Sequence, residues 1–277
     1  MNHVKALEKV DSFIYGLYNF LQHISFVFKF GIKKRLSNNK KMKNKHKGER
    51  CFIVLNGPSI NNYNLELIKG EFTICTNYFY RSQLVDVVKP NYYCWSDGIV
   101  FDPKNEYVLK ELFEKCNYSN FFFGSKALKL SFLKEKRNVF FTFNKLRCRE
   151  NHISSSLDKI STNFGTVAIY AINVAIFLGF KDIYMLGYDF PPGTFIHFEN
   201  LGKTIAEENR EFSDSKDKVC GSYRGYLSAQ YDNFYMSKYA KKKGVKIYNC
   251  NRNSYVRSYA FADFESLFDD SMDENKN

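Results

Sequence analysis

Apolar residues recur every three or four positions over residues 4–30, the spacing of one face of an α-helix. The stripe consists of Leu7, Val10, Ile14, Leu17, Leu21, Ile24 and Phe28. Polar Asn19, Gln22 and His23 interrupt this run, so the pattern predicts an amphipathic helix rather than a membrane span. A helix of this kind either packs on a domain or lies in the plane of a membrane surface.

A basic segment follows this helix. Between Lys33 and Arg50 the chain carries nine Lys and Arg residues against Glu49 alone. The stretch 37–48 is either a solvated polar connector or a surface that faces anionic lipid. Helix and charges together favour a cytoplasmic protein held peripherally at the inner face of a bacterial inner membrane. Residues 1–49 are therefore expected to form an amphipathic helix and a basic linker.

From residue 50 onward, short apolar runs alternate with helical stretches. The expected strands are 51–55, 72–76, 92–95, 120–123, 139–143, 182–186 and 245–248, and the expected helices are 104–116, 166–178 and 228–243. Such alternation predicts an α/β fold, Rossmann-like, with a mostly parallel sheet and helices on both faces. The domain is expected to span residues 50–268, with an acidic tail at 269–277.

Composition and missing motifs exclude several classes of function. The net charge of +12 favours an anionic partner, but no recognisable nucleic-acid module is present. Seven scattered cysteines without a CxxC pair indicate free thiols in a reducing cytoplasm rather than a metal site. The chain lacks the P-loop motif, which argues against a P-loop nucleotide hydrolase, and the GxGxxG fingerprint, which argues against a dinucleotide enzyme. It also contains neither a GxSxG nor an HExxH motif. It also lacks an Asp-x-Asp motif at a strand end, which disfavours metal-dependent sugar transfer.

Polar groups follow three of the expected strands. The first strand runs into Asn56, Gly57 and Ser59, the second into Asn77, and the third into Ser96 and Asp97. Taken singly, the first motif can be an ordinary Gly-Pro turn and Asp97 a helix cap. Together they predict a ligand site at the carboxyl edge of the sheet, where open α/β sheets bind ligands.

Two further segments extend this pattern. A polar cluster precedes the apolar helix 166–178 and comprises Ser161, Thr162, Asn163, Gly165 and Thr166. Helix capping explains one of these residues, and a helix N-terminus also accepts an anion. The strand 182–186 leads into Asp189 and then His197. A single histidine in a loop is commonly just solvated, but the position of His197 after the sheet edge favours a functional role.

These motifs resemble bacterial sialyltransferases of glycosyltransferase family 42, in order and spacing from about residue 50 to 265. The similarity rests on Asn-Gly-Pro-Ser at 56–59, on Asn77 and on Gly-Tyr-Asp-Phe at 187–190. The segments 245–250 and 263–268 are more similar still to surface-polysaccharide proteins described by their likeness to archaeal 6-hydroxymethylpterin diphosphokinase.

The resemblance implies transfer of a nonulosonic, sialic-acid-like or Kdo-like sugar from a CMP-activated donor, with no cofactor or metal. The acceptor would be an oligosaccharide or a lipid-linked glycan of lipopolysaccharide or capsule. Asn56 and Asn77 match asparagines that contact the donor, and Ser96 or Asp97 stands where the family has another. The segment 161–166 matches the loop that holds the sugar carboxylate, and His197 falls on a tyrosine that steadies the leaving phosphate.

The chain departs from that family at the general base. The family histidine is expected between residues 221 and 230, yet residues 221–227 contain none. His197 is the first candidate for this role, since imidazole titrates near neutral pH, and Asp189 is the second. Three residues are candidates for binding the phosphate or the acceptor: Tyr223, Arg224 and Tyr226.

Two rivals from other classes stay open. One is a pyrophosphokinase that acts on a pterin with ATP and Mg²⁺, and the other is a non-catalytic module of a polysaccharide assembly complex. A homo-oligomer is equally open.

Overall fold

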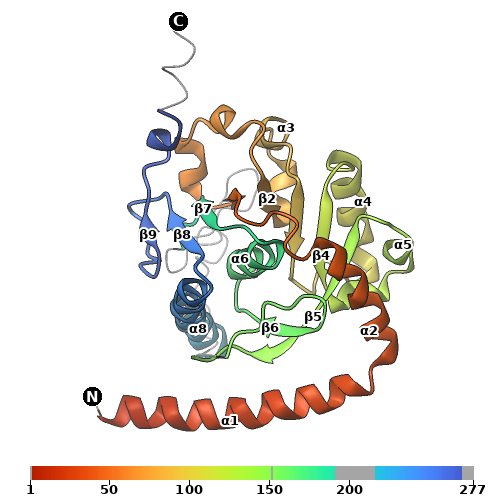
Figure 1. Ribbon diagram of the computed structural model, residues 1–277, viewed down its shortest axis with the longest axis vertical. Helices are drawn as coiled ribbons and strands as arrows, with labels where there is room; N and C mark the ends of the chain where they lie inside the picture. Colours follow the sequence, from red (N-terminus) through yellow and green to blue (C-terminus); the bar gives the residue numbers. More distant parts are fainter. Residues whose placement is uncertain (1, 151, 191–215, 270–277) are drawn as a thin grey trace, which may run out of the picture.

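A nine-stranded parallel sheet organises the described part of the chain, residues 2–150, 152–190 and 216–269 of the computed structural model (Figure 1). The strands are β1 Arg50–Val54, β2 Thr73–Thr76, β3 Tyr92–Trp95, β4 Asn120–Gly124, β5 Val139–Arg147, β6 Ile160–Asn163, β7 Asp182–Leu186, β8 Lys246–Asn249 and β9 Ala260–Phe261. Their order in the sheet is β6-β5-β4-β3-β2-β1-β7-β8-β9, and every neighbouring pair is parallel. The Rossmann-like α/β class expected from the sequence is confirmed.

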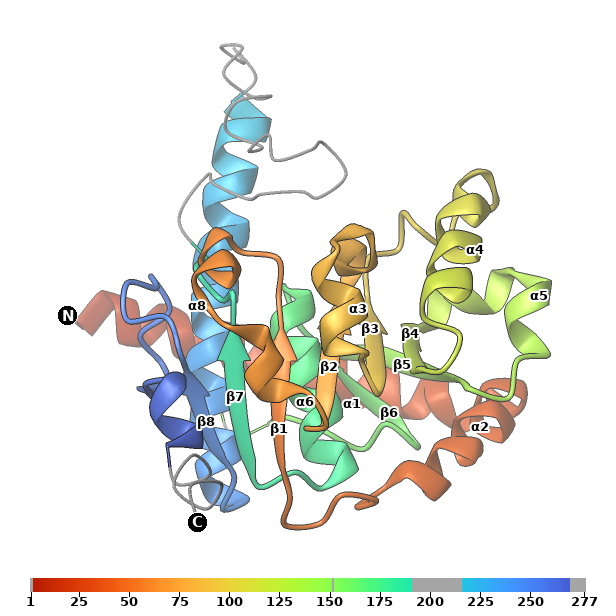
Figure 2. The same cartoon turned by 90° about the horizontal axis from the view of Figure 1, so that it is seen from above.

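Helices cover both faces of this sheet. The helices are α1 Asn2–Val27, α2 Phe30–Ser37, α3 Leu84–Val88, α4 Glu106–Lys115, α5 Ser131–Lys134, α6 Val167–Leu178 and α8 Lys216–Lys242. One core joins α6 and α8 to the sheet, and a second core joins α3, α4 and short 3₁₀ turns to the opposite face. Figure 2 shows α8 rising past the edge of the sheet where the strands end.

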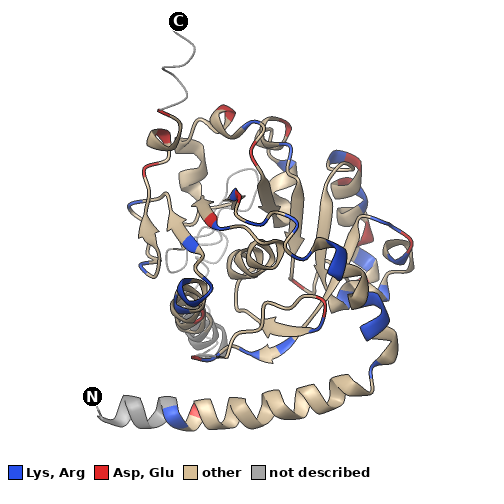
Figure 3. Cartoon of the chain, viewed as in Figure 1, with Lys and Arg blue, Asp and Glu red and all other residues tan. Residues whose placement is uncertain are grey.

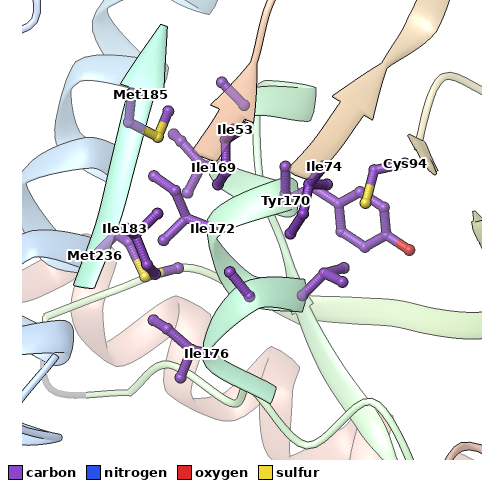
Figure 4. Close-up of a cluster of buried hydrophobic side chains, with 14 of the residues drawn as sticks. Ile53, Ile74, Cys94, Ile169, Tyr170, Ile172, Ile176, Ile183, Met185 and Met236 are labelled. Carbon is purple, nitrogen blue, oxygen red and sulfur yellow. The ribbon is translucent and has the colours of Figure 1, made fainter. Parts of the chain in front are cut away.

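The helix α6 is apolar on all sides because it lies between the sheet and α8. Its buried side chains meet those of β1, β2, β3 and β7 (Figure 4). The Thr166 side chain caps the first turn by accepting the Ile169 N–H at 3.4 Å. Gly179 ends the helix at a φ of 98°, the left-handed conformation that favours glycine. Both ends agree with the helix expected over residues 166–178.

The order of the strands reverses beside β1. From β1 the chain proceeds outward through β2 to β6, and α6 then returns it to β7 on the other side of β1. The loops that follow β1 and β7 therefore leave in opposite directions. In open α/β sheets a crevice forms at this point, at the carboxyl ends of the strands.

Two strands were not expected. Residues 160–163 form β6 although they read Ile-Ser-Thr-Asn, because pairing with β5 outweighs their weak apolar pattern. The two exposed residues of β9 add an edge strand beside β8. In addition, α8 begins at residue 216, earlier than the 228 that the pattern indicated.

The segment 38–48 is not the solvated linker that its lysines suggested. Asn39 is fully buried, and its side-chain amide donates to the carbonyls of Phe141 at 2.8 Å and Leu157 at 2.7 Å. The backbone N–H groups of Asn44 and His46 bind the carbonyls at the end of α6. The charged lysines face solvent while the polar and apolar residues between them fix the segment to the domain.

The helix α1 packs on the domain over part of its length. Asn19 bonds both backbone groups of Arg147 at the end of β5, and Phe26 packs against Phe143 and its neighbours. Many of its other apolar side chains are exposed, among them Phe13 at 75% and Leu17 at 55%. None of the described helices has the length and hydropathy needed to cross a bilayer.

His46 joins the N-terminal segment to the core. Its ring is 6% exposed and lies parallel to the ring of Phe180, with centroids 4.6 Å apart. The Nδ1 atom lies 2.6 Å from Glu49 Oε2, and Nε2 lies 2.6 Å from the Tyr92 hydroxyl. Burial lowers the pKa of His46, although the neighbouring Glu49 acts in the opposite direction.

Replacing His46 by Ala should therefore destabilise the fold by about 2–4 kcal/mol, through a lost buried ring and an unpaired Tyr92 hydroxyl. Urea unfolding measures this, with the exposed His23→Ala as the matched control.

Because burial lowers the folded-state pKa of His46, the unfolded chain takes up a proton at higher pH than the folded protein does. The free energy of unfolding therefore falls as pH drops below about 6.5. His46→Gln should reduce that slope; an unchanged slope would contradict the role of His46.

Candidate functional site

The loops that follow β1, β2, β3, β6 and β7 enclose a cavity of about 400 Å³. This volume lies within the ~300–1,000 Å³ range of small-molecule sites. Polar lining comes from Asn56, Asn77, Asp97, Thr166 and Asp189. The sheet thus brings together residues more than a hundred positions apart, at the edge that the sequence indicated.

Two glycines allow the loops after β1 and β7 to approach each other. The Gly57 N–H donates to the Gly187 carbonyl at 3.0 Å. A Cβ atom on Gly57 would lie 2.7 Å from Asp189 Oδ2, and one on Gly187 would lie 2.6 Å from the Leu55 carbonyl oxygen. Gly187 also has a φ of 68°. Both positions therefore require glycine.

Asp189 connects three loops at this junction. Its carboxylate accepts the Ser59 N–H at 2.8 Å, the Ser59 hydroxyl, and the Asn251 amide at 2.6 Å. The side chain is 9% exposed. These bonds position the loops after β1, β7 and β8 relative to one another. Ser59, expected to bind substrate, is bonded to Asp189.

The side chains of Asn56 and Asn77 each have a hydrogen-bond acceptor that is free to bind a ligand. The Oδ1 atom of each is buried without a partner among the described residues, and both residues line the cavity. Asn77 has a φ of 48°, and its carbonyl accepts the buried Tyr93 hydroxyl at 2.7 Å. An unpaired buried acceptor costs about 1–3 kcal/mol, and strained polar residues concentrate at binding sites. A ligand that donates hydrogen bonds would satisfy both oxygens.

The N-terminus of α6 reaches the same cavity. Thr166 caps the Ile169 N–H, whereas Val167 and Ala168 lie at the first turn and line the cavity. The first N–H groups of a helix have no partner within it and carry partial positive charge. This end of α6 can therefore hold an anionic group of a ligand.

Aromatic rings form the remaining wall. Tyr78 and Trp95 meet edge to face with centroids 4.9 Å apart. Phe190 lines the cavity and stacks on Tyr226 of α8 at 5.2 Å, so Tyr226 lies just behind the wall. Flat apolar rings beside amide groups suit a nucleobase, which presents a π-face and hydrogen-bonding edges.

Several expected site residues lie elsewhere. Ser161 and Thr162 belong to β6 rather than to a loop; the Ser161 hydroxyl donates to Asn144, and Thr162 bonds Ser154. Ser96 and Asn163 line a second pocket beside the cavity. His197 lies outside the described residues, as do the side chains of Tyr223 and Arg224, whose backbone belongs to α8.

A family model described as 6-hydroxymethylpterin diphosphokinase MptE-like matches residues 18–191, more than half of the chain. The chain belongs to this family. No curated protein matches it.

Solved structures similar to this chain include sialyltransferases. One is the sialyltransferase CstII from Campylobacter jejuni in complex with CMP-3FNeuAc, with 16% identity, a TM-score of 0.45, and coverage of 77% of this chain and 85% of that one. Another is the alpha-2,3-sialyltransferase from Campylobacter jejuni in apo form, with 18% identity, a TM-score of 0.41, and coverage of 77% and 79%. Likeness at this level assigns no residue role to the MptE-like chain.

Two residues that hold the loops at the cavity were not among the candidates predicted from the sequence. Asp232 and Asn233 lie on α8; Asp232 accepts the Gly165 N–H at 2.8 Å, and Asn233 accepts the Tyr188 hydroxyl at 2.9 Å. A signal was present, because Ala229, Met236 and Ala240 at helical spacing form a buried stripe that includes both. Polar residues on a buried stripe require partners, which here hold the loops at the cavity.

Burial raises the pKa of Asp232. In the unfolded chain the Asp232 carboxyl group loses its proton at a lower pH than in the folded protein. The free energy of unfolding of the wild-type protein therefore falls as pH rises from about 4 through the folded-state pKa. Asp232→Asn keeps an acceptor for the Gly165 N–H and should gain stability relative to wild type over that interval. Asp232→Leu should cost about 1–3 kcal/mol by leaving the N–H unpaired. Thermal unfolding at several pH values tests this, with exposed Glu114→Gln as control; equal effects of Asn and Leu would refute it.

Proposed function

We propose that this chain is a glycosyltransferase that takes a nonulosonic sugar, sialic-acid-like or Kdo-like, from a CMP-activated donor. The observation that supports this most is the cavity at the strand-order reversal, where the unpaired amide oxygens of Asn56 and Asn77 lie beside aromatic rings and the N-terminus of α6. These three features match two parts of a nucleotide: the amide oxygens and the aromatic rings match the amino group and the flat ring of the base, and the helix N-terminus matches the phosphate.

In this proposal the cytosine amino group donates to one of the two asparagine oxygens, and the base contacts the wall that contains Tyr78 and Trp95. The phosphate lies against the first turn of α6, at Val167 and Ala168. The cavity is lined by Asp97 and Asp189 but by no Lys or Arg among the described residues. Among the described residues, the backbone N–H groups of this turn are therefore the donors available to the phosphate, and Tyr223 and Arg224 stay candidates for the same role.

The reaction is a direct displacement at the anomeric carbon of the sugar. The acceptor hydroxyl oxygen forms the new bond to that carbon while the bond to the phosphate oxygen breaks, and CMP leaves with the electron pair. The hydroxyl proton passes to a general base. We assign this role to His197, because Asp189 is already bonded to Ser59 and Asn251 and positions the loops. No cofactor or metal enters the proposal.

Pyrophosphate transfer from ATP to a pterin is the second candidate, favoured by the description of the family. Such a kinase uses Mg²⁺, and the ligands available among the described lining residues are the two carboxylates of Asp97 and Asp189. Both oxygens of Asp189 already accept hydrogen bonds, and Asp97 Oδ1 accepts the Ile99 N–H. No group of three His, Cys, Asp or Glu side chains that could hold a metal occurs in the described part. This donor set does not fit a catalytic divalent cation.

We further propose that the acceptor is a glycan of lipopolysaccharide or capsule and that the enzyme works at the inner face of the inner membrane. The support is α1, which carries no charged residue after Asp11 (Figure 3). Large apolar side chains of α1 are exposed. Basic residues occur in α2 and in the segment that follows it (Figure 3), and most of these lysines are exposed. Apolar area and basic charge together bind anionic lipid surfaces.

The donor assignment predicts that CMP binds the wild-type protein and that a CMP-sugar of the nonulosonic class releases CMP in its presence. Replacing by Ala the asparagine that accepts the cytosine amino group, Asn56 or Asn77, should weaken CMP binding by about tenfold, by removing a hydrogen bond to the ligand. His197→Ala should retain CMP affinity and lose most turnover, since general bases contribute about 10²–10⁴-fold. Calorimetry and a CMP-release assay measure these quantities.

The control is Asn253→Ala, an exposed asparagine away from the cavity. Full turnover in His197→Ala would refute its role as base. ATP-dependent formation of AMP in place of CMP release would support the kinase, and inertness toward every donor would support a non-catalytic assembly module.

The membrane assignment predicts sedimentation with vesicles that contain anionic lipid, and little with vesicles of neutral lipid. Phe13→Ser combined with Phe20→Ser should reduce the bound fraction several-fold, because both rings are largely exposed on α1. Exposed Tyr107→Ser on α4 is the matched control. Equal sedimentation of the α1 variant and wild type would exclude α1 as the membrane contact.

A further inference from the structure

A second pocket, of about 340 Å³, lies beside the donor cavity at the same edge of the sheet. Its wall includes residues at the ends of β3, β4, β5 and β6, together with Tyr18 of α1. We name it the basic pocket, and its principal polar residues are Ser96, Ser125, Lys126, Lys145, Arg147 and Asn163. None of the functions considered so far uses Lys126, Lys145 or Arg147.

The lining of the basic pocket carries only positive charge, although Arg147 also interacts electrostatically with Asp232 of α8. No Asp or Glu belongs to its lining, and in the described part of the chain no carboxylate forms an ion pair with any of its three cations. The donor cavity shows the reverse, with Asp97 and Asp189 and no cation among its described lining residues. Three neighbouring positive charges repel one another, so an anion in this pocket would relieve the repulsion.

Two of the three cations, Arg147 and Lys126, make further contacts that limit where they can lie. Arg147 is fixed through its backbone, whose N–H and C=O both bond the Asn19 side chain of α1, and its guanidinium lies 5.7 Å from the Tyr18 ring centroid. Lys126 lies across Gly98, where an added Cβ atom would come within 2.7 Å of its Cε. The three cations of the basic pocket therefore come from β5 and from the turn after β4, and α1 contacts Arg147.

The size and position of the basic pocket indicate its ligand. Its volume is about ten times the ~30 Å³ that one water occupies, enough for a phosphoryl group together with the sugar that bears it. The Ser96 and Ser125 hydroxyls add hydrogen bonds of the kind that phosphate oxygens accept. Three cations match a phosphoryl group, which carries up to two negative charges, better than a single carboxylate.

The two pockets meet at the loop after β3. Ser96 and Gly98 line the basic pocket, whereas Asp97 between them lines the donor cavity. A molecule whose phosphoryl group lies in the basic pocket would extend its attached group toward the donor cavity. Because α1 forms one wall and exposes apolar side chains along its length, the same position is open to a lipid that bears a phosphate.

We propose that the basic pocket binds a phosphoryl group of the acceptor substrate, and that this group directs the acceptor hydroxyl toward the donor. The proposal rests on the proposed function in taking the neighbouring cavity as the donor site. The phosphoryl group belongs either to a phosphorylated sugar or to a lipid headgroup, since both offer the same oxyanion.

The test compares Lys126→Gln/Lys145→Gln with the control Lys129→Gln/Lys159→Gln, which removes two exposed lysines outside the pocket. The probes are glucose 6-phosphate, inorganic phosphate and vesicles that contain phosphatidic acid, each at low salt, with CMP binding measured in parallel. We expect the first variant to bind glucose 6-phosphate or the vesicles at least tenfold more weakly than wild type, since it removes two charged hydrogen-bond donors to the phosphoryl group. CMP affinity and the urea midpoint should be unchanged.

The outcomes separate this inference from the donor assignment. Loss confined to glucose 6-phosphate identifies a phosphorylated sugar, and loss confined to vesicles identifies a lipid headgroup. Unchanged affinity for every phosphate probe, or an equal loss in the control variant, would overturn the basic pocket as a phosphoryl site. An equal loss of CMP affinity would also overturn it, because the cations would then serve the donor. If wild type binds a phosphate probe at this pocket but not CMP, the proposed function fails and the phosphoryl site stands.

Discussion

The close approach of Gly57 and Gly187 is the constraint on which the site depends. Their hydrogen bond holds the loops after β1 and β7 together where the strand order reverses, and Asp189 extends the junction to the loop after β8 through Ser59 and Asn251. Without a side chain at either glycine, the two loops approach closely enough to form one wall of the cavity at the strand-order reversal. The remaining walls come from the ends of β2 and β3 and from the start of α6. The packing of α6 on the sheet places its N-terminus at the cavity.

The carboxyl edge of the sheet is divided by charge. Around β1, β2 and β7 it offers amide oxygens, aromatic rings and a helix N-terminus, while around β4 and β5 it offers Lys126, Lys145 and Arg147. An edge arranged in this way can hold two different ligands side by side, one recognised by its base and one by its phosphoryl charge. The contact of α1 with Arg147 places a helix with exposed apolar side chains at the second of these positions.

The sequence predicts most of the fold, because the buried strands and α6 have strong apolar patterns with clear ends such as Gly179. It also places Asn56, Asn77 and Thr166 at one edge, since carboxyl ends of parallel strands meet there. The sequence wrongly predicts that Ser161 and Thr162 lie in a ligand-binding loop. They belong to β6, whose pairing with β5 determines where their side chains lie. The lysine-rich segment 38–48 misleads for a similar reason: its buried residues Asn39 and His46 are few but make specific bonds. The cations of the basic pocket and the helix beside them come from α1, β5 and the turn after β4. These segments are far apart in the sequence, so no local sequence pattern predicts that they lie together.

A crystal structure of the protein with CMP tests the central claim most directly. The account predicts the base within hydrogen-bonding distance of Asn56 or Asn77, one face of it against the wall of Tyr78 and Trp95, and the phosphate at the first turn of α6. CMP bound away from these residues, or with its phosphate among Lys126, Lys145 and Arg147, would contradict it.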